Sequence, residues 1–196
     1  MLKVFSIFLI IFVSINGLCI LILYLIPIEC PRIVSREQWG AVPPKNDSGS
    51  IAKVPWVVIH HSATINCTTE AACERLMRSI QNFHMETNDW DDIGYNFMVG
   101  ENGAVYTGRG WTTQGAHTVG FNSRSIGIAF IGTFIDKIPN VAARAAARQL
   151  IQCGVSLAHI HPQYNIIGHR QAALTECPGE SLFHEISNWP RFEPNP

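Results

Sequence analysis

Residues 54–61 have the sequence VPWVVIHH, an apolar run that ends abruptly in two histidines. The run from Val54 to Ile59 predicts a buried β-strand, because it is short and apolar and its proline lies near its start. Successive side chains of a strand point to opposite faces, so only one of the two histidines can face a site at the strand's end. The stretch therefore predicts a strand that delivers one imidazole to a functional edge.

The segments around this strand alternate between helix and strand patterns. Thr68 or Thr69 can cap a helix with one apolar face. Asn102-Gly103 is a strong hairpin signal between strands at 95–99 and 104–107. The pattern predicts an α/β fold in which a central mixed β-sheet is flanked by helices. The remaining expected elements are strands at 125–134 and 164–167, an Ala-rich helix capped by Asn140, and a short helix that starts at Ser181.

A third histidine and a cysteine lie far downstream, where Cys177 opens a Cys-Pro-Gly turn eight positions after His169. Together with one histidine of the His60-His61 pair they suit a zinc ion, and three protein ligands leave the fourth position for water. A lone histidine beside a strand is more often a hydrogen-bonded core residue, and a cysteine in an exported protein is more often half of a disulfide. The zinc interpretation therefore depends on whether Cys177 is paired.

The cysteine count favours an unpaired Cys177. The chain has six cysteines, and one of them lies in the apolar N-terminal stretch, apart from the folded domain. An odd number remains, which leaves one thiol without a partner in an oxidising compartment. Cys67 and Cys73 can close a short loop, and Cys30 and Cys153 can tie the start of the domain to a late helix. Under this pairing Cys177 is the free thiol.

The N-terminal stretch from Val4 to Ile28 carries no charge. At about 25 residues it can cross a hydrocarbon core of about 30 Å. A secretory signal usually has a shorter apolar region and a small-residue cleavage site, so an uncleaved anchor with Lys3 in the cytoplasm is slightly favoured. We expect residues 1–29 to be a signal peptide or signal anchor. Residues 30–196 are expected to form one extracellular domain, either secreted or held as a single-pass type II membrane protein with possible membrane association through this segment.

The charges of the chain nearly balance. It has 14 Lys+Arg against 15 Asp+Glu, a formal net charge of −1. The chain has no excess of basic residues, so nucleic acid is not an expected partner.

Eight short motifs are spread in order over the exported part of the chain: IVSREQWGA (33–41), VVIHHSA (57–63), DIGYNF (92–97), GRGW (108–111), GAH (115–117), SIGIAFIG (125–132), GHR (168–170) and TECPG (175–179). In these motifs the chain strongly resembles the peptidoglycan recognition proteins, which share a fold with the lysozyme-like zinc amidases of bacteriophages. Any one motif is a weak signal, whereas so many in one order are specific.

The resemblance implies an N-acetylmuramoyl-L-alanine amidase that uses zinc to cut peptidoglycan between muramic acid and the stem peptide, in recognition or scavenging of the bacterial cell wall. It implies His60, His169 and Cys177 as zinc ligands. Tyr95 and Thr175 match the catalytic members, with the phenol placed where charge develops on the intermediate and the threonine holding water or intermediate. Zinc lowers the pKa of a bound water from about 15.7 toward about 7.

The resemblance also implies a groove for the glycopeptide. The residues expected to contact the substrate are Arg109, Trp111, His117 and Asn122. An exposed Trp beside an Arg suits a sugar face next to a stem-peptide carboxylate. The alternatives are loop packing for Trp111 and a solvated charge for Arg109.

Two other functions stay open at this point. A binding-only receptor of the same family requires a failed metal site, and the sequence keeps the cysteine that such receptors most often replace with serine. A Cys-His hydrolase would use Cys177 as nucleophile and His169 as base. A thiol beside a Pro-Gly turn with two histidines in reach fits metal coordination better than nucleophilic attack.

Overall fold

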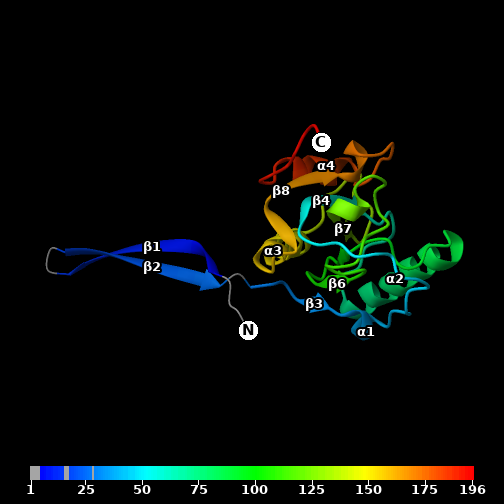
Figure 1. Ribbon diagram of the computed structural model, residues 1–196, viewed down its shortest axis with the longest axis horizontal. Helices are drawn as coiled ribbons and strands as arrows, with labels where there is room; N and C mark the ends of the chain where they lie inside the picture. Colours follow the sequence, from blue (N-terminus) through cyan, green and yellow to red (C-terminus); the bar gives the residue numbers. More distant parts are fainter. Residues whose placement is uncertain (1–4, 16–17, 28) are drawn as a thin grey trace.

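The computed structural model describes residues 5–15, 18–27 and 29–196. In the last of these ranges, six strands form a sheet in the order β3-β6-β5-β7-β4-β8 (Figure 1). The pair β5/β6 is antiparallel, whereas the other neighbouring pairs are parallel, so the expected mixed sheet is confirmed. The strands are β3 Ile33–Val34, β4 Val54–His61, β5 Phe97–Val99, β6 Val105–Thr107, β7 Ser125–Phe130 and β8 Ile160–Gly168.

Helices cover both faces of this sheet, and Figure 1 shows α2 and α3 on different sides of it. On one face Val57 and Ile59 of β4 lie in a buried cluster with the apolar residues of α3 and α4. On the other face Met98 of β5 packs with Trp39 of α1 and Met77 of α2. The helical elements are α1 Arg36–Trp39, α2 Glu70–Asn82, the π-helical turn η1 Phe83–Thr87, the 3₁₀ turns η2 Asn122–Arg124 and η3 His169–Gln171, α3 Val141–Ser156 and α4 Glu180–Ser187.

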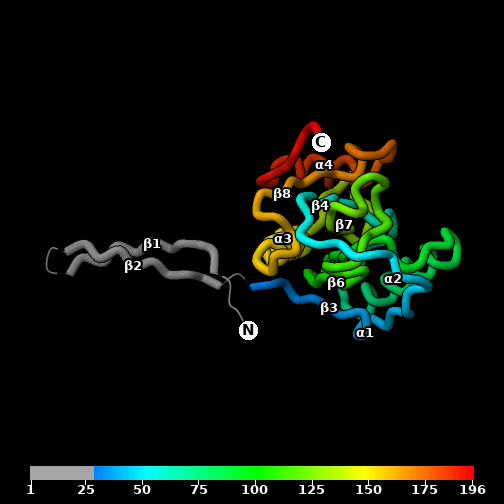
Figure 2. Tube along the Cα trace, viewed as in Figure 1, coloured from blue at the N-terminus to red at the C-terminus, as the bar shows by residue number. Residues whose placement is uncertain are grey.

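The strands β4 and β8 lie side by side although a hundred residues separate them in the chain (Figure 2). They run parallel, and their register pairs Ile59 with Gly168. In parallel strands the carboxyl ends meet at the same edge, which is where open α/β sheets place their ligands. The residues that follow this pair, His60 and His169, are therefore brought to one edge of the sheet.

The helix caps follow the sequence signals. Thr69, and not Thr68, caps α2, because its hydroxyl accepts a hydrogen bond from the Ala72 N–H. Asn140 caps α3 in the same way, accepting from the Ala143 N–H. A side-chain acceptor at this position satisfies a backbone donor that the helix leaves without a partner.

Several strand boundaries differ from the prediction. β6 begins one residue later than expected, at Val105, and β8 runs from Ile160 to Gly168 where a strand at 164–167 was expected. β5 begins at Phe97 and not at residue 95, so Tyr95 lies in the loop before the strand, where the backbone N–H of Asn96 still donates to Gly127. β7 ends at Phe130 and not at residue 134, because the chain turns at Gly132, whose φ of 144° is open to glycine.

The N-terminal stretch contains two strands, β1 Phe5–Ile15 and β2 Leu18–Pro27, which pair antiparallel. Among the described residues no helix is long and apolar enough to cross a membrane. Lys3, on which the expected orientation rests, lies outside the described residues.

Both expected disulfides are present. Cys30 is bonded to Cys153, and Cys67 to Cys73. The first bond ties the segment before β3 to α3 across a sequence separation of 123 residues, and the second spans a separation of 6. Within residues 29–196 Cys177 is the free cysteine, and it is buried.

We predict that the two bonds differ in their contribution to stability. The serine pair Cys30→Ser/Cys153→Ser should lower the free energy of unfolding by up to about 5 kcal/mol, because the long loop loses most entropy when closed. The matched pair Cys67→Ser/Cys73→Ser should cost about 2 kcal/mol. Urea unfolding of the three proteins provides the comparison, and equal losses for both pairs would contradict the loop-length argument.

Candidate metal centre

Two imidazoles meet where β4 and β8 end. His60 is the second-last residue of β4 and is 1% exposed, while His169 is the first residue of η3, directly after β8. Their ring centroids are 4.5 Å apart. The parallel register of the two strands produces this proximity.

Cys177 completes the group from the loop between η3 and α4. Its Sγ lies 3.6 Å from Nδ1 of His60 and accepts a hydrogen bond from the His61 N–H at 3.4 Å. The loop is held by backbone contacts as well, because the Arg170 N–H donates to the Cys177 carbonyl at 2.8 Å. The ligand atoms of His60, His169 and Cys177 all lie within 4.8 Å of one another.

The spacing of these donors fits zinc. Zinc binds histidine nitrogen at about 2.0 Å and cysteine sulfur at about 2.3 Å, so two such ligands of a tetrahedral ion lie about 3.5 Å apart. The distance between His60 Nδ1 and Cys177 Sγ is 3.6 Å. The two nitrogen donors and one sulfur donor are also the ligand types that zinc prefers.

Burial keeps the three donors uncharged while no metal is bound. It lowers the pKa of His60 well below its ordinary value, and the nearby rings of His117, His169 and His61 further disfavour a positive charge on His60. Burial also lowers the pKa of His169. It raises the pKa of the Cys177 thiol to about 11, and the hydrogen bond from the His61 backbone opposes this only in part. Both imidazoles therefore offer lone pairs at neutral pH, whereas the thiol must lose a proton to bind a metal.

His61 turns away from the other donors, as strand alternation predicts. Its Nδ1 accepts a hydrogen bond from the Phe134 N–H at 3.3 Å. The side chain thereby ties the loop after β7 to the end of β4.

The donors line a pocket of about 280 Å³, here called the His–Cys pocket. Tyr95 stands in its wall, with its ring centroid 5.3 Å from that of His60. Burial, and then the nearby Cys177, raise the pKa of the phenol, so it remains protonated and able to donate a hydrogen bond. The remaining lining residues are His61, Ser62, Ala63, Trp90, Ala116, His117 and Thr175.

Thr175 lies beside the third donor. Its Oγ1 accepts a hydrogen bond from the Cys177 N–H at 3.2 Å, and the side chain is exposed at the pocket. Because the hydroxyl acts there as an acceptor, its hydrogen is free to donate. Thr175 thus both shapes the turn and offers a donor to the pocket.

Trp90 and His84 were not selected from the sequence. Trp90 lines the His–Cys pocket, and its ring packs on His84, which in turn lies 5.6 Å from Tyr95 by ring centroids. His84 accepts from the Gly94 N–H at 3.0 Å, and burial lowers its pKa to about 4. The helix α2 ends at Asn82, and His84 lies in the π-helical turn that follows it. Such turns are frequent at functional sites.

The expected substrate residues fall in different places. His117 lines the His–Cys pocket, and its Nδ1 lies 3.1 Å from Nε2 of His60. Asn122 does not line it; its Oδ1 accepts hydrogen bonds from the backbone N–H groups of His117 and Thr118. Asn122 therefore holds the loop that carries His117.

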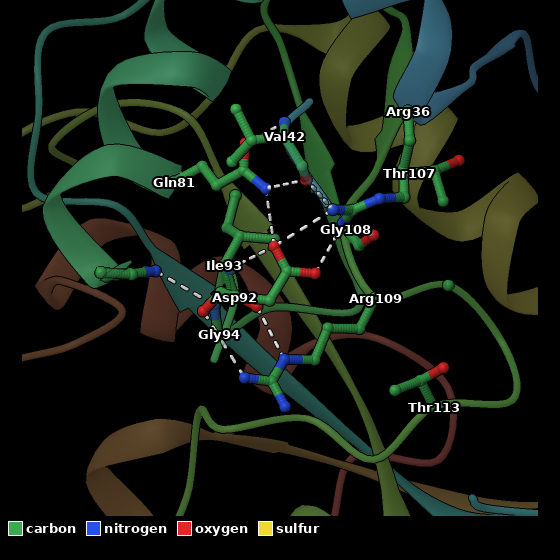
Figure 3. A network of polar contacts seen from close by, with 12 residues as sticks. Arg36, Val42, Gln81, Asp92, Ile93, Gly94, Thr107, Gly108, Arg109 and Thr113 are labelled. Atoms are coloured by element: carbon green, nitrogen blue, oxygen red, sulfur yellow. Dashed lines mark hydrogen bonds and ion pairs between the residues drawn. The ribbon is translucent and has the colours of Figure 1, made fainter. Parts of the chain in front are cut away.

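Arg109 lies outside the His–Cys pocket and is 9% exposed, so it is not a solvated charge. Its Nε donates to the Ile93 carbonyl at 2.8 Å and its Nη1 to the Gln114 carbonyl at 2.9 Å. Figure 3 shows this guanidinium beside Asp92, whose buried carboxylate pairs with Arg36 at 2.8 Å. Arg109 joins the loop of Tyr95 to the loop of His117 and also lines a second, larger cavity of about 520 Å³.

The expectation of an exposed Trp111 is wrong. Its ring is partly buried against the core, 4.4 Å from Phe97 by ring centroids, and stacks on His159 at 5.3 Å. The space it occupies depends on a glycine in α3, because a Cβ at Gly154 would lie 2.7 Å from the indole. The structure gives Trp111 a packing role.

Comparison with known proteins gives one consistent family. The N-acetylmuramoyl-L-alanine amidase family matches residues 51–180. The chain is 43% identical to human peptidoglycan recognition protein 3, covering 84% of this chain and 48% of the human protein. It is 41% identical to peptidoglycan-recognition protein 2 of Holotrichia diomphalia, over 85% of this chain and 89% of that protein. An N-acetylmuramoyl-L-alanine amidase of Sus scrofa is 44% identical over 85% of this chain, which corresponds to 28% of the amidase.

Solved structures agree with this assignment. Bumblebee PGRP-SA superposes with a TM-score of 0.83 at 40% identity, covering 85% of this chain and all of that one. Peptidoglycan recognition protein LE, in complex with tracheal cytotoxin, a monomeric diaminopimelic acid-type peptidoglycan, superposes with a TM-score of 0.81 at 43% identity, over 82% of this chain and 95% of that one.

We predict that zinc binding releases about one proton from Cys177 at pH 7. The thiol, with its pKa near 11, is protonated before binding, whereas both histidines are already neutral. Zinc affinity should therefore rise with pH up to the pKa of the thiol. Calorimetric titration in two buffers of different ionisation enthalpy measures the released proton.

The matched control is Cys177→Ser, whose hydroxyl keeps its proton at this pH and should remove the buffer dependence together with most of the affinity. A zinc-binding enthalpy of the unaltered protein that is the same in both buffers would contradict the assignment of Cys177 as a ligand.

Proposed function

The chain belongs to the N-acetylmuramoyl-L-alanine amidase family, among the peptidoglycan recognition proteins, and on this basis we propose that it is a zinc-dependent member that hydrolyses peptidoglycan. The bond cut is the amide between N-acetylmuramic acid and L-alanine of the stem peptide. The observation that carries the proposal is the complete donor group of His60, His169 and Cys177 in one pocket.

The residues of the pocket have different proposed roles in metal binding and catalysis. When bound, zinc supplies a Lewis acid and lowers the pKa of a coordinated water. His60, His169 and Cys177 hold the ion, and the buried setting of His60 keeps competing water away from the donors. The surrounding pocket of about 280 Å³ admits the scissile amide but not the whole polymer, so most of the substrate lies outside it.

Tyr95 is proposed to donate a hydrogen bond to the oxygen of the scissile carbonyl as negative charge develops there. Its raised pKa keeps the phenol protonated, and its ring stands next to His60 in the pocket wall. Thr175, whose Oγ1 accepts from the Cys177 N–H, offers a second donor to the pocket. A donor aimed at a developing oxyanion typically contributes about 3 kcal/mol to lowering the barrier.

The proposed partner is peptidoglycan, and the proposed location is outside the cell. A similar structure holds a peptidoglycan fragment, which supports the substrate class. The two disulfides support an oxidising, extracellular compartment. The domain acts there whether residues 1–29 are removed as a signal peptide or retained. Arg109 and His117 remain proposed groove residues, the former beside the larger cavity.

A binding-only receptor is the second candidate function, and the relatives named only for recognition favour it. A Cys-His hydrolase is less well supported. Its nucleophile would be the thiolate of Cys177, but burial raises the pKa of this thiol to about 11 and leaves it protonated at neutral pH.

We predict that the protein releases stem peptides from a soluble muropeptide only when zinc is bound. Dialysis against a strong chelator should abolish release, and added zinc should restore it, because the proposed nucleophile is a water activated by the metal. Mass spectrometry of the products identifies the bond that is cut.

The matched variant for this assay is Cys177→Ser, which should still bind muropeptide while releasing no stem peptide, since serine is a poor zinc ligand at neutral pH. Activity that survives chelation but is lost on thiol alkylation would instead support the Cys-His hydrolase. Binding without any release by the unaltered protein would support the receptor.

We predict that Tyr95→Phe lowers turnover by about 10² or more and leaves the Michaelis constant near its original value. The phenol acts mainly in the transition state, whereas the aromatic ring that packs beside His60 is retained in phenylalanine. Steady-state kinetics on a soluble glycopeptide measures both constants. Unchanged turnover, or an effect confined to the Michaelis constant, would remove Tyr95 from the catalytic residues.

A further inference from the structure

The two ring nitrogens of His60 face different partners. Nδ1 points toward Cys177, 3.6 Å from its Sγ, and Nε2 lies 3.1 Å from Nδ1 of His117. The rings of His60 and His117 meet nearly edge-on, with an interplanar angle of 79° and centroids 5.0 Å apart. The contact with His117 is therefore on the side of His60 away from the thiol.

The position of His117 is built into the fold. The residue is 8% exposed, and its ring fills space left by Gly115, two residues before it, and by Gly127 in β7. A Cβ at Gly127 in β7 would lie 2.4 Å from the imidazole Cδ2, and a Cβ at Gly115 would lie at the same distance. Neither glycine has a positive φ, so the backbone conformation does not require glycine at these positions. The close approach of the His117 ring does. Asn122 holds the backbone of His117 from the other side.

The hydrogen bonds around His117 determine which nitrogen carries the proton. The Ser125 hydroxyl donates its one hydrogen to the Phe121 carbonyl at 2.8 Å. Toward His117 Nε2, 3.5 Å away, this hydroxyl can only accept, which places the proton of His117 on Nε2. Nδ1 of His117 is then an acceptor, and its neighbour Nε2 of His60 must be the donor.

Thr118 is compatible with this arrangement. Its Oγ1 lies 3.1 Å from His117 Nδ1 and 3.3 Å from His60 Nε2. A hydroxyl can donate to the first nitrogen and accept from the second, so no group in this cluster is left without a partner.

From this geometry we propose that His117 is a positioning residue: it fixes the orientation and tautomer of His60, so that Nδ1 of His60 is the nitrogen that binds the metal. The identity of the metal as zinc rests on the proposed function above. The partner of a ligating histidine typically changes metal affinity by about 10 to 100-fold when it is removed. His117 thus acts on the metal through His60, in addition to any contact with the substrate.

The tautomer is measured without zinc, by long-range ¹⁵N NMR of the metal-free chain. We expect His60 to carry its proton on Nε2 and to lose this preference in His117→Leu. A His60 protonated on Nδ1 in the unaltered protein would overturn the inference. If the leucine variant fails to fold, the tautomer of His60 in the unaltered protein is sufficient to test the inference.

Zinc affinity is measured by competition with a chelator. His117→Leu should bind zinc about 10 to 100-fold more weakly. The matched variant His117→Asn keeps an acceptor oxygen close to the position of Nδ1 and should bind nearly as well as the unaltered protein. Unchanged zinc affinity in His117→Leu, with a loss of muropeptide binding alone, would overturn the positioning role. Failure of the unaltered protein to bind zinc would contradict the proposed function and leave the tautomer result standing.

Discussion

The parallel pairing of β4 with β8 is the constraint on which the candidate site depends. Its register places Gly168 beside Ile59, and so the residues that follow them, His169 and His60, at the same edge. Moving His60 by one position along β4 would turn its imidazole to the other face of the sheet. The buried clusters on both faces stabilise this register, because Val57 and Ile59 pack on one face while Val58 and His60 point to the other.

The third donor depends on different forces. Cys177 lies in a loop, where no ladder of hydrogen bonds fixes its position, and it is held by contacts with Arg170, Thr175 and the backbone of His61. The disulfides matter here too, because they remove four other thiols from competition for the metal. A buried thiol, the buried imidazole of His60, the half-buried imidazole of His169 and a protonated phenol make a pocket that is nearly uncharged until a cation enters it.

The sequence predicted those parts of the protein that follow from local patterns. The apolar run at 54–59, the caps Thr69 and Asn140 and the Asn-Gly hairpin are all visible in neighbouring residues. The two-residue strand β3 and the four-residue helix α1 were not predicted, because elements so short show no periodicity.

The directions in which some side chains outside the regular elements point could not be predicted from neighbouring residues either. Trp111 packs inward because Gly154, in a distant helix, leaves room for its ring, and His84 turns toward Gly94 because α2 passes into a π-helical turn. The kinds of donor, two histidines and an unpaired cysteine, were predictable from residue types and the cysteine count, whereas the choice of His60 over His61 came from the family resemblance. The support of His60 by His117 was not predicted, because it depends on Gly127 in a separate strand as well as on the nearby Gly115.

The most direct test of the account is the position of bound zinc. Anomalous X-ray scattering, recorded on either side of the zinc absorption edge from crystals grown with zinc, should give one peak within bonding distance of His60 Nδ1, a nitrogen of His169 and Cys177 Sγ. A peak at another place, or a Cys177 that is engaged in a disulfide with no zinc beside it, would contradict the account.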